Sequence, residues 1–375
     1  MTFSLPAATP VARSITGVVP QLVAALSGTS AWFAPARSAI VFTVDGLGAH
    51  NLSARRGHAR FLAANRSKKD VARTVFPSTT ATALTSLLTG ADAGEHGVVG
   101  YRARVPGTDV IANQLKGWDE HTIDPATWQR AEPLFAREAA RGRPCFVVTM
   151  PAFASSGFTR ATTRGAQMLT AQTTGERALL AAELAARHPG ALIYVYTPDL
   201  DRVGHKHGVE SEQWSAALEE VDGAVRSLAE ALPADVGAVV TADHGMVDVP
   251  RHRQVLLTEG DTLLDGVHLI GGEPRMLHLY ALDGEADGVR ARWAEAEGGR
   301  SWVMSRDEAI GAGLFGRVDA AVRGRIGDVL VAARAGIVYY DDRLVDKAAQ
   351  KMVGQHGSLS PEETTVPLIR LGAFA

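Results

Sequence analysis

Aspartate and histidine residues occur in three short motifs that each follow an apolar run of the chain. The motifs are Asp45-Gly46, Asp201-Arg202-Val203-Gly204-His205 and Asp243-His244-Gly245. Carboxylate oxygens and imidazole nitrogens together bind zinc and related transition metals. Because Asp201 and His205 are four residues apart, one helical turn would direct both side chains to the same side. Asp199 and His207 are close enough in the sequence to be alternatives to that pair.

Two further segments add hydroxyl groups and a third histidine. The hydroxyls belong to Ser78, Thr79 and Thr80, which follow Phe76-Pro77 and open a helical stretch that ends at Gly90. A helix N-terminus attracts anions, so a hydroxyl there is placed to attack a phosphate, although Ser78 or Thr79 could equally cap the helix. His356 lies late in the chain, where a solvated loop position is the alternative. Together the five segments offer the donors of a two-metal site.

The apolar runs before these motifs predict the strands that must position them. Runs at 39–44, 146–149, 192–196 and 237–241 are continuously apolar, which is typical of parallel strands covered on both faces. Helical patterns lie between them, at 173–187 and after a cap at Ser211. We therefore predict an α/β fold with a mostly parallel central sheet flanked by helices. Ligands bind beyond the carboxyl ends of such strands, where the motifs occur.

The segment 253–325 interrupts this alternation. It contains the turn Gly271-Gly272-Glu273-Pro274-Arg275, a strand-like run at 276–280 and a helical pattern at 286–297. We therefore predict a catalytic α/β core formed by residues 1–252 together with 326–375, and a small inserted αβ lobe at 253–325.

Composition restricts the class of protein further. The 375 residues include 38 Lys and Arg against 41 Asp and Glu, and 46% are hydrophobic. This balance excludes intrinsic disorder for most of the chain and offers no broad basic surface for polymeric nucleic acid. The single cysteine, Cys145, excludes an internal disulfide and a zinc site built from cysteines. No run reaches the ~18 apolar residues of a membrane span, and a secretory signal is lacking, so we expect a cytoplasmic protein.

In their order along the chain, these motifs resemble the alkaline phosphatase superfamily, and most closely its nucleotide pyrophosphatase/phosphodiesterase branch. The resemblance covers about residues 38–360 and includes two further segments, Glu95-His96-Gly97-Val98-Val99-Gly100 and Ala242-Asp243-His244-Gly245-Met246-Val247-Asp248. It implies two zinc ions per chain, with manganese or iron as alternatives. One ion would bind Asp45, Asp243 and His244, and the other Asp201, His205 and His356. Thr80 would be the nucleophile and a metal ligand, because it matches the second threonine of the family's Phe-Pro-Thr-x-Thr pattern.

The resemblance also implies the reaction. Small phosphorylated substrates such as nucleotides would be hydrolysed through a covalent phosphothreonine intermediate, with phosphodiesters or pyrophosphates preferred. The basis of this preference is charge: a monoester dianion needs an additional cation, and the basic residues near the motifs are few. A phosphomonoesterase, a phosphonate hydrolase and a catalytically silent protein that binds phosphorylated ligands remain alternatives. A sulfatase is excluded because the sequence has no Cys/Ser-x-Pro-x-Arg segment.

One position departs from the branch. Its members usually carry an asparagine just after the Gly-Val-Val-Gly segment, where the asparagine helps to hold a phosphoryl oxygen, and here that position is Tyr101. A tyrosine hydroxyl also donates a hydrogen bond, from a longer reach. Tyr101 and Asn113 are therefore our candidates for substrate contacts, with an ordinary surface role as the alternative for Asn113.

Overall fold

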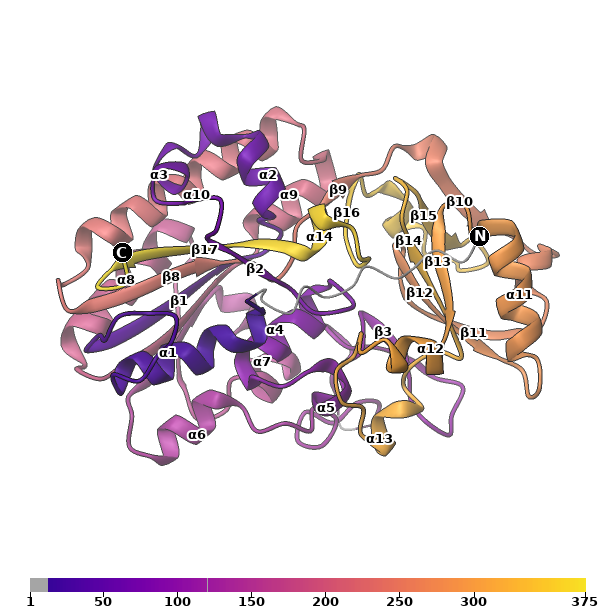
Figure 1. Ribbon diagram of the computed structural model, residues 1–375, viewed down its shortest axis with the longest axis horizontal. Coiled ribbons are helices and arrows are strands. Elements are labelled where there is room, and N and C mark those ends of the chain that lie inside the picture. Colours follow the sequence, from indigo (N-terminus) through magenta and orange to yellow (C-terminus); the bar gives the residue numbers. More distant parts are fainter. Residues whose placement is uncertain (1–12, 120) are drawn as a thin grey trace.

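A large central sheet and a smaller second sheet organise the computed structural model, which describes residues 13–119 and 121–375 (Figure 1). The large sheet lies on the left of Figure 1 and the second sheet on the right. The large sheet has seven strands, in the spatial order β2 (Val71–Arg73), β17 (Thr365–Gly372), β8 (Val236–Thr241), β1 (Ser38–Val44), β7 (Leu192–Thr197), β5 (Cys145–Thr149) and β6 (Gln167–Thr170). Strands β8, β1, β7, β5 and β6 are parallel, whereas β17 is antiparallel to β8 and to β2.

The four apolar runs of the sequence form the central parallel strands. Every residue of β1, β5 and β8 is buried, as expected where helices cover both faces of a sheet. In register, Val41 pairs with Tyr194 of β7 on one side and with Val239 of β8 on the other. The prediction of a mostly parallel central sheet is confirmed.

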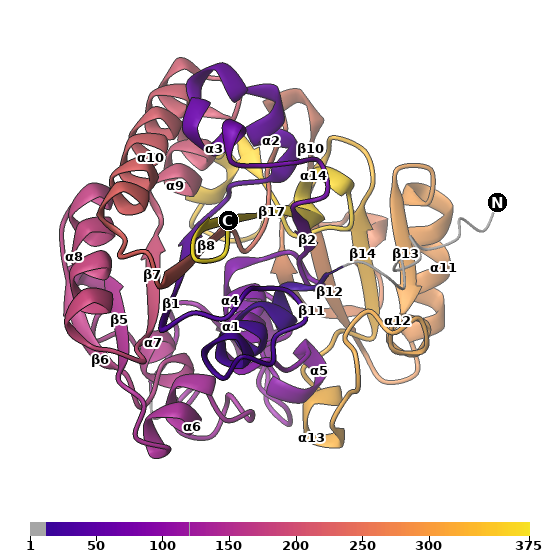
Figure 2. The same cartoon turned by 60° about the vertical axis from the view of Figure 1, so that its left-hand side comes forward.

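Helices cover both faces of the large sheet (Figures 1 and 2). One face carries α2 (Ala49–Ala54), α3 (Arg60–Ala64), α8 (Thr174–Arg187), α9 (Asp199–His207) and α10 (Glu212–Ala231). The other face carries α1 (Val18–Leu26), α4 (Thr80–Thr89), α6 (Leu134–Ala140) and α7 (Gly157–Thr162). The predicted cap of α10 is present, because the Ser211 side chain accepts a hydrogen bond from the Trp214 N–H.

The second sheet is antiparallel and has a hydrophobic core of its own. Its order is β11 (Val267–Glu273), β12 (Met276–Ala281), β14 (Val329–Ala333) and β13 (Ser301–Ser305). Three helices occur in the same part of the chain, α11 (Ala286–Glu297), α12 (Arg306–Gly311) and α13 (Ala320–Arg323). The sheet thus takes strands from residues 267–333, and β14 lies in its interior. The division of the chain into a core and an inserted lobe stays a prediction.

Short pairings join segments that are distant in the sequence. Strand β10 (Gln254–Leu257) pairs with β15 (Val338–Asp341), and β3 (Arg102–Arg104) pairs with β4 (Ile111–Asn113). Strand β9 (Val247–Asp248) pairs with β16 (Gly354–Gln355). This last pairing brings the segment after His244 next to the segment before His356. Two short helices complete the fold, α5 (Ala93–His96) and α14 (Pro361–Thr364).

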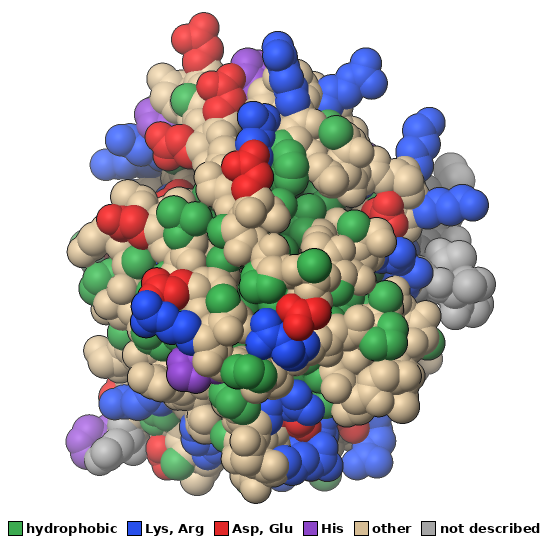
Figure 3. Space-filling model, turned by 90° about the vertical axis from the view of Figure 1, so that its left-hand side faces the viewer, with side chains coloured by type: hydrophobic (Ala, Val, Ile, Leu, Met, Phe, Trp, Pro, Cys, Tyr) green, Lys and Arg blue, Asp and Glu red, His purple; other side chains and the backbone are tan. Residues whose placement is uncertain are grey.

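The surface carries charges of both signs. On the face in Figure 3, acidic and basic side chains are interspersed among hydrophobic ones, in keeping with the nearly balanced composition. None of the helices that the structure describes is long and apolar enough to cross a membrane.

Candidate metal centre

The carboxyl ends of three neighbouring strands bring the aspartate motifs together. Asp45 follows β1, Asp243 follows β8 after one residue, and α9 begins just after β7. The Asp45 N–H donates to the Thr197 carbonyl over 2.9 Å, and the Gly46 N–H donates to Asp243 Oδ1 over 3.2 Å. Gly46 has φ +76°, and a Cβ at this position would lie 3.1 Å from the Cα of Asp201. The turn therefore needs glycine both for its backbone conformation and for its close approach to α9.

Asp45, Asp243 and His244 form one cluster of potential ligands. One donor atom from each lies within 4.8 Å of the other two. His244 Nε2 is 3.4 Å from Asp45 Oδ1 and 3.4 Å from Asp243 Oδ2. All three side chains are buried, and these two carboxylate oxygens have no hydrogen-bond partner among residues 13–119 and 121–375. Buried oxygens of this kind are costly unless something outside the chain binds them.

Asp201, His205 and His356 form an adjoining group. Asp201 Oδ2 lies 3.4 Å from His205 Nε2, one helical turn along α9, and Asp201 Oδ1 lies 3.9 Å from His356 Nε2. Donor atoms of Asp201 and His356 also lie within 4.8 Å of one on His244. His205 Nδ1 is 2.8 Å from the Gly354 carbonyl, and His356 Nδ1 is 3.0 Å from the Ser78 carbonyl. Because a carbonyl only accepts, each Nδ1 donates, which leaves each Nε2 as the atom that can bind a metal.

Thr80 opens helix α4 beside the same histidine. Its Oγ1 lies 3.1 Å from His244 Nε2, and its side chain is buried. The preceding Thr79 is the N-cap residue, and Gly90 ends the helix with φ +72°, as the sequence predicted. Ser78 is engaged elsewhere, because its hydroxyl donates to the Ser358 carbonyl over 2.7 Å. The structure therefore brings Thr80, rather than Ser78, to the metal-ligand cluster.

Burial and like charges shift the pKa values of the clustered groups. Burial raises the pKa of Asp45 well above its usual range, the charges of Asp243 and Asp201 raise it further, and the Tyr196 hydroxyl, which donates to Asp45 Oδ2, acts in the opposite direction. The pKa of Asp243 is also raised, mainly by burial. The pKa of His356 is lowered well below its usual value by burial and then by the neighbouring His244 and His205. A bound divalent cation would favour both the ionised acids and the neutral imidazoles, so the residues fit such an ion.

The alternative ligands lie outside the cluster. The Asp199 carboxylate accepts from Arg177 Nη2 over 2.8 Å and from the hydroxyls of Thr174 and Thr197 over 3.0 Å each. His207 is exposed. Asp199 thus fixes the start of α9, the helix that carries Asp201 and His205.

The two proposed substrate contacts lie near the β3–β4 hairpin. Tyr101 and Asn113 are both half-buried. Asn113 Oδ1 accepts from the N–H groups of Leu115 and Lys116 over 2.9 Å each, so its acceptor oxygen is occupied by its own turn. Their contacts with a substrate stay predictions. Sequence reasoning missed Tyr196, for which the available signal was an aromatic residue at the carboxyl end of the strand predicted at 192–196.

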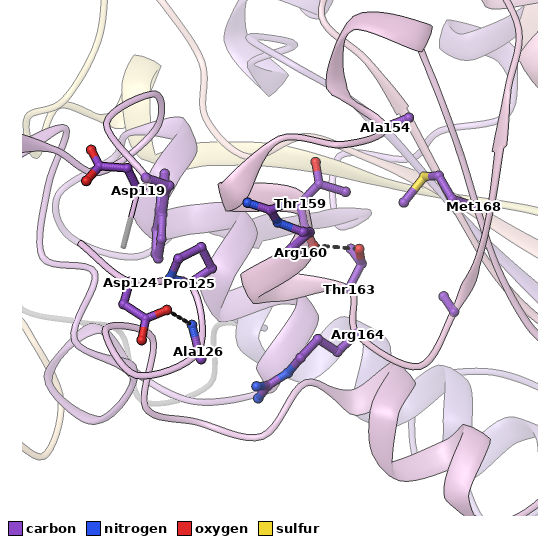
Figure 4. A pocket seen from close by; sticks show the side chains of 12 residues that line it. Asp119, Asp124, Pro125, Ala126, Ala154, Thr159, Arg160, Thr163, Arg164 and Met168 are labelled. Carbon is purple, nitrogen blue, oxygen red and sulfur yellow. Dashed lines mark hydrogen bonds between the residues drawn. The ribbon is translucent and has the colours of Figure 1, made fainter. Parts of the chain in front are cut away.

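Residues outside the cluster line a groove of about 740 Å³ (Figure 4). Trp118, Arg160, Arg164 and Met168 are among the residues that line it. Another, Ala154, follows Phe153, whose ring centroid is 5.9 Å from that of Tyr196. Figure 4 shows the Asp124 carboxylate directed at the N–H of Ala126, a 2.8 Å hydrogen bond. None of the clustered aspartates or histidines is part of the groove.

Comparison with protein families gives a match over most of the chain. Residues 39–359 match the family described as type I phosphodiesterase / nucleotide pyrophosphatase. The chain belongs to this family. The matched region of this phosphodiesterase-family protein contains every clustered aspartate and histidine as well as Thr80. The resemblance drawn from the motifs is thereby confirmed.

Solved structures with the same fold include two kinds of enzyme. Murine ectonucleotide pyrophosphatase / phosphodiesterase 5 superposes with a TM-score of 0.69 at 19% identity, over 88% of this chain and 87% of that one. Phosphonoacetate hydrolase from Sinorhizobium meliloti 1021 also gives 0.69 at 19% identity, over 90% and 91%. The human ectonucleotide pyrophosphatase / phosphodiesterase 5 gives 0.68 at 18% identity, over 90% and 88%. These likenesses confirm the α/β fold. No significant match was found among curated proteins.

Proposed function

We propose that this protein is a two-metal hydrolase that cleaves phosphodiester or pyrophosphate bonds through a covalent phosphothreonine on Thr80. The observation that supports this most directly is the position of Thr80 Oγ1, 3.1 Å from His244 Nε2. His244 belongs to a buried cluster in which three carboxylates each leave one oxygen without a hydrogen-bond partner in the described part of the chain. A nucleophilic hydroxyl beside a group of potential metal donors is the arrangement that phosphoryl transfer requires.

The donor set divides into two ligand groups. Asp45, Asp243 and His244 would hold one ion, and Asp201, His205 and His356 the other, with Thr80 next to the first. When bound, two such ions supply positive charge to the attacking and departing oxygens of the phosphate. Zinc suits these mixed oxygen and nitrogen donors, and manganese or iron would also accept them.

The residues of the chain perform two successive displacements. Thr80 Oγ attacks phosphorus, so that an O–P bond forms, the bond to the leaving oxygen breaks, and the hydroxyl proton passes to solvent. The free N–H groups at the start of α4 favour the anionic phosphoryl group during this step. Water then attacks the phosphothreonine, the Thr80–phosphorus bond breaks, and Thr80 recovers a proton. Two in-line steps give net retention of configuration at phosphorus.

Two of the structural relatives bear on the substrate. An inactive threonine-to-alanine variant of murine ectonucleotide pyrophosphatase / phosphodiesterase 5 has been solved in complex with AMP, which favours a threonine nucleophile and a nucleotide substrate here. Phosphonoacetate hydrolase has been solved with phosphonoformate and with phosphonoacetate. A phosphonate substrate is therefore the alternative to be tested in parallel.

The charges around the cluster favour diesters over monoesters. Within residues 13–119 and 121–375, Asp45, Asp201 and Asp243 form ion pairs only with histidines. Of the basic residues near the motifs, Arg102 donates from Nε to the Gly272 carbonyl over 3.4 Å, and Arg202 is exposed. A monoester dianion would bring one more negative charge than a diester without a dedicated cationic partner.

The substrate test compares four compounds at one pH with saturating zinc. We expect kcat/KM for bis(4-nitrophenyl) phosphate and a nucleotide nitrophenyl diester to exceed that for 4-nitrophenyl phosphate about tenfold or more, with no turnover of phosphonoacetate. A tenfold preference for the monoester would replace the phosphodiesterase with a phosphatase. Turnover of phosphonoacetate alone would replace it with a phosphonate hydrolase.

The nucleophile test uses variants of helix α4. Thr80→Ala should abolish turnover while zinc content and fold remain. Thr85→Ala is the matched control in the same helix, because its hydroxyl donates to the Ala81 carbonyl over 2.6 Å and its loss should cost about 1 kcal/mol of stability without affecting turnover. If Thr79→Ala were inactive and Thr80→Ala active, the nucleophile would be the preceding residue.

A further inference from the structure

The β11–β12 hairpin of the second sheet contacts the loop that follows His356. Its turn contains Glu273, the last residue of β11, which is 4% exposed. Glu273 Oε1 has no hydrogen-bond partner in the part of the chain that the structure describes. A buried carboxyl group with an unpaired oxygen is rare away from functional sites.

Glu273 lies against the backbone that follows His356. Gly357 has φ +128°, and a Cβ built on it would lie 2.6 Å from Cγ and 2.7 Å from Cδ of Glu273. Only glycine leaves room for the Glu273 side chain at this point. The carboxyl group therefore packs directly on the loop that holds His356.

The same loop is joined to the segment that precedes Thr80. The Ser78 N–H donates to the Gly357 carbonyl over 3.2 Å, and His356 Nδ1 donates to the Ser78 carbonyl over 3.0 Å. The Thr79 hydroxyl lies near enough to Glu273 to act on the pKa of its carboxyl group, which it lowers. Glu273 thus touches both segments where they meet, one leading to the nucleophile and the other to a metal-ligand histidine.

The surroundings of Glu273 favour its neutral form. Burial raises its pKa to about 8, and the nearby Glu363 adds to this effect, whereas the Thr79 hydroxyl and the Arg102 charge oppose it. A neutral carboxylic acid both donates and accepts a hydrogen bond, and it does not repel an anionic phosphate. The contacts with Thr79 and Gly357 do not depend on this protonation state.

We propose that Glu273 is a positioning residue of the site, which fixes the Thr79–Thr80 segment relative to the His356–Gly357 loop. The second sheet then contributes to phosphoryl transfer through this side chain, which helps to set the distance between nucleophile and metal ligands. Such distances matter because small displacements of reacting groups lower the rate steeply. The inference rests on the proposed function, and its test separates the two.

The test compares Glu273→Gln, which keeps the shape and hydrogen-bonding capacity of the neutral acid, with Glu273→Leu. In zinc-loaded full-length protein, we expect Glu273→Leu to lower kcat for the nucleotide nitrophenyl diester about 100-fold, with KM changed less than about threefold. Glu273→Gln should retain kcat within about threefold of wild type. The control is Glu297→Gln, because Glu297 is an equally buried carboxylate of the same part of the fold whose partners are Arg300 and Tyr339.

A second readout does not depend on turnover. Amide hydrogen exchange in metal-free protein should become about tenfold faster at residues 78–80 and 357–358 in Glu273→Leu, and should remain as in wild type in Glu273→Gln. Wild-type kcat in Glu273→Leu together with unchanged exchange would overturn the inference, as would equal losses of kcat in the Gln and Leu variants. Wild-type protein without turnover of any phosphate ester would refute the proposed function instead, and the exchange data would then decide the role of Glu273.

Discussion

Buried carboxylates have different ion-pair partners in two regions of this protein. Near the second sheet, Glu363 accepts from Arg275 Nε over 2.8 Å and from Nη2 over 2.7 Å, and both side chains are almost fully buried. At the strand ends of the large sheet, Asp45, Asp201 and Asp243 have only histidines as ion-pair neighbours within the described chain. The first region supplies its own cation, and the second does not.

The difference separates acids that stabilise the fold from acids that are available to a ligand. Burying an unpaired carboxylate is costly, whereas a carboxylate held by two guanidinium hydrogen bonds is satisfied. Helix α9 shows a similar difference between two acids that are two residues apart, of which Asp199 is 36% exposed. Asp199 is bound by the buried Arg177, while Asp201 Oδ1 is unpartnered among the residues described. The chain therefore leaves unpaired the acids that we assign to the metals.

The largest expected effect comes from removing one unpaired acid. Asp243→Asn should lower kcat/KM about 1,000-fold or more and reduce the zinc content, because it removes one ligand of a metal. In the metal-free protein the same change should leave the melting temperature unchanged or raise it, because a buried charge without a cation is lost. Elemental analysis measures the zinc content, and calorimetry measures the melting temperature. Strong destabilisation of the metal-free Asp243→Asn protein would contradict the proposed difference between the two regions.

Breaking a paired acid should act in the opposite direction. Arg275→Met leaves Glu363 buried without its cation, and we expect a loss of about 3–5 kcal/mol in the free energy of unfolding. Denaturant titration of metal-free protein measures it. Arg300→Met is the control, because its partner Glu297 is buried but Arg300 is itself nearly half exposed, so solvent will screen the loss. Equal losses in both variants would show that burial does not govern the cost.

Metal removal should affect stability moderately. Zinc at about 100 times its dissociation constant should add about 2.7 kcal/mol to the free energy of unfolding per site. We expect about two zinc ions per wild-type chain, and chelation should lower the melting temperature. The chelator should have no such effect on a variant that lacks Asp45, Asp201 and Asp243. One ion or none after reconstitution would count against the two ligand groups.

The smallest effect concerns Glu273, which forms no ion pair within the described residues and has no metal role. Its pKa is about 8 in the folded protein against an ordinary 4.5, so between these values the unfolded chain has lost a proton that the folded protein retains. The free energy of unfolding therefore falls as the pH rises through this window. Glu273→Gln cannot ionise and so lacks this pH dependence. The difference between its melting temperature and that of wild type should therefore grow in favour of the variant by a few degrees from pH 5 to pH 9. A constant difference would show that Glu273 ionises normally.

Local patterns in the sequence were sufficient for the parts of the site that depend on local structure. Continuous apolar runs predicted the central strands, and the spacing of Asp201 and His205 predicted their common direction on one helix. The choice between Asp199 and Asp201 depends on Arg177, a residue of another helix, which no local pattern reveals. Glu273 was visible only as part of a turn, because its contact with Gly357 arises from the packing of the hairpin onto the site. The sequence of residues 328–333 likewise predicts a strand, but no local pattern reveals that this strand, β14, pairs with β12 and β13.

The wide separation of the ligands along the chain has a consequence for biosynthesis. Asp45 and His356 lie near opposite ends of the matched family region, 39–359, and strand β17, which follows His356, inserts between β2 and β8. During translation, the unpaired aspartates are made long before the last histidine leaves the ribosome. The ligand group Asp201, His205 and His356 therefore stays incomplete until the end of the region is made, and the edge of β8 stays unpaired until β17 follows.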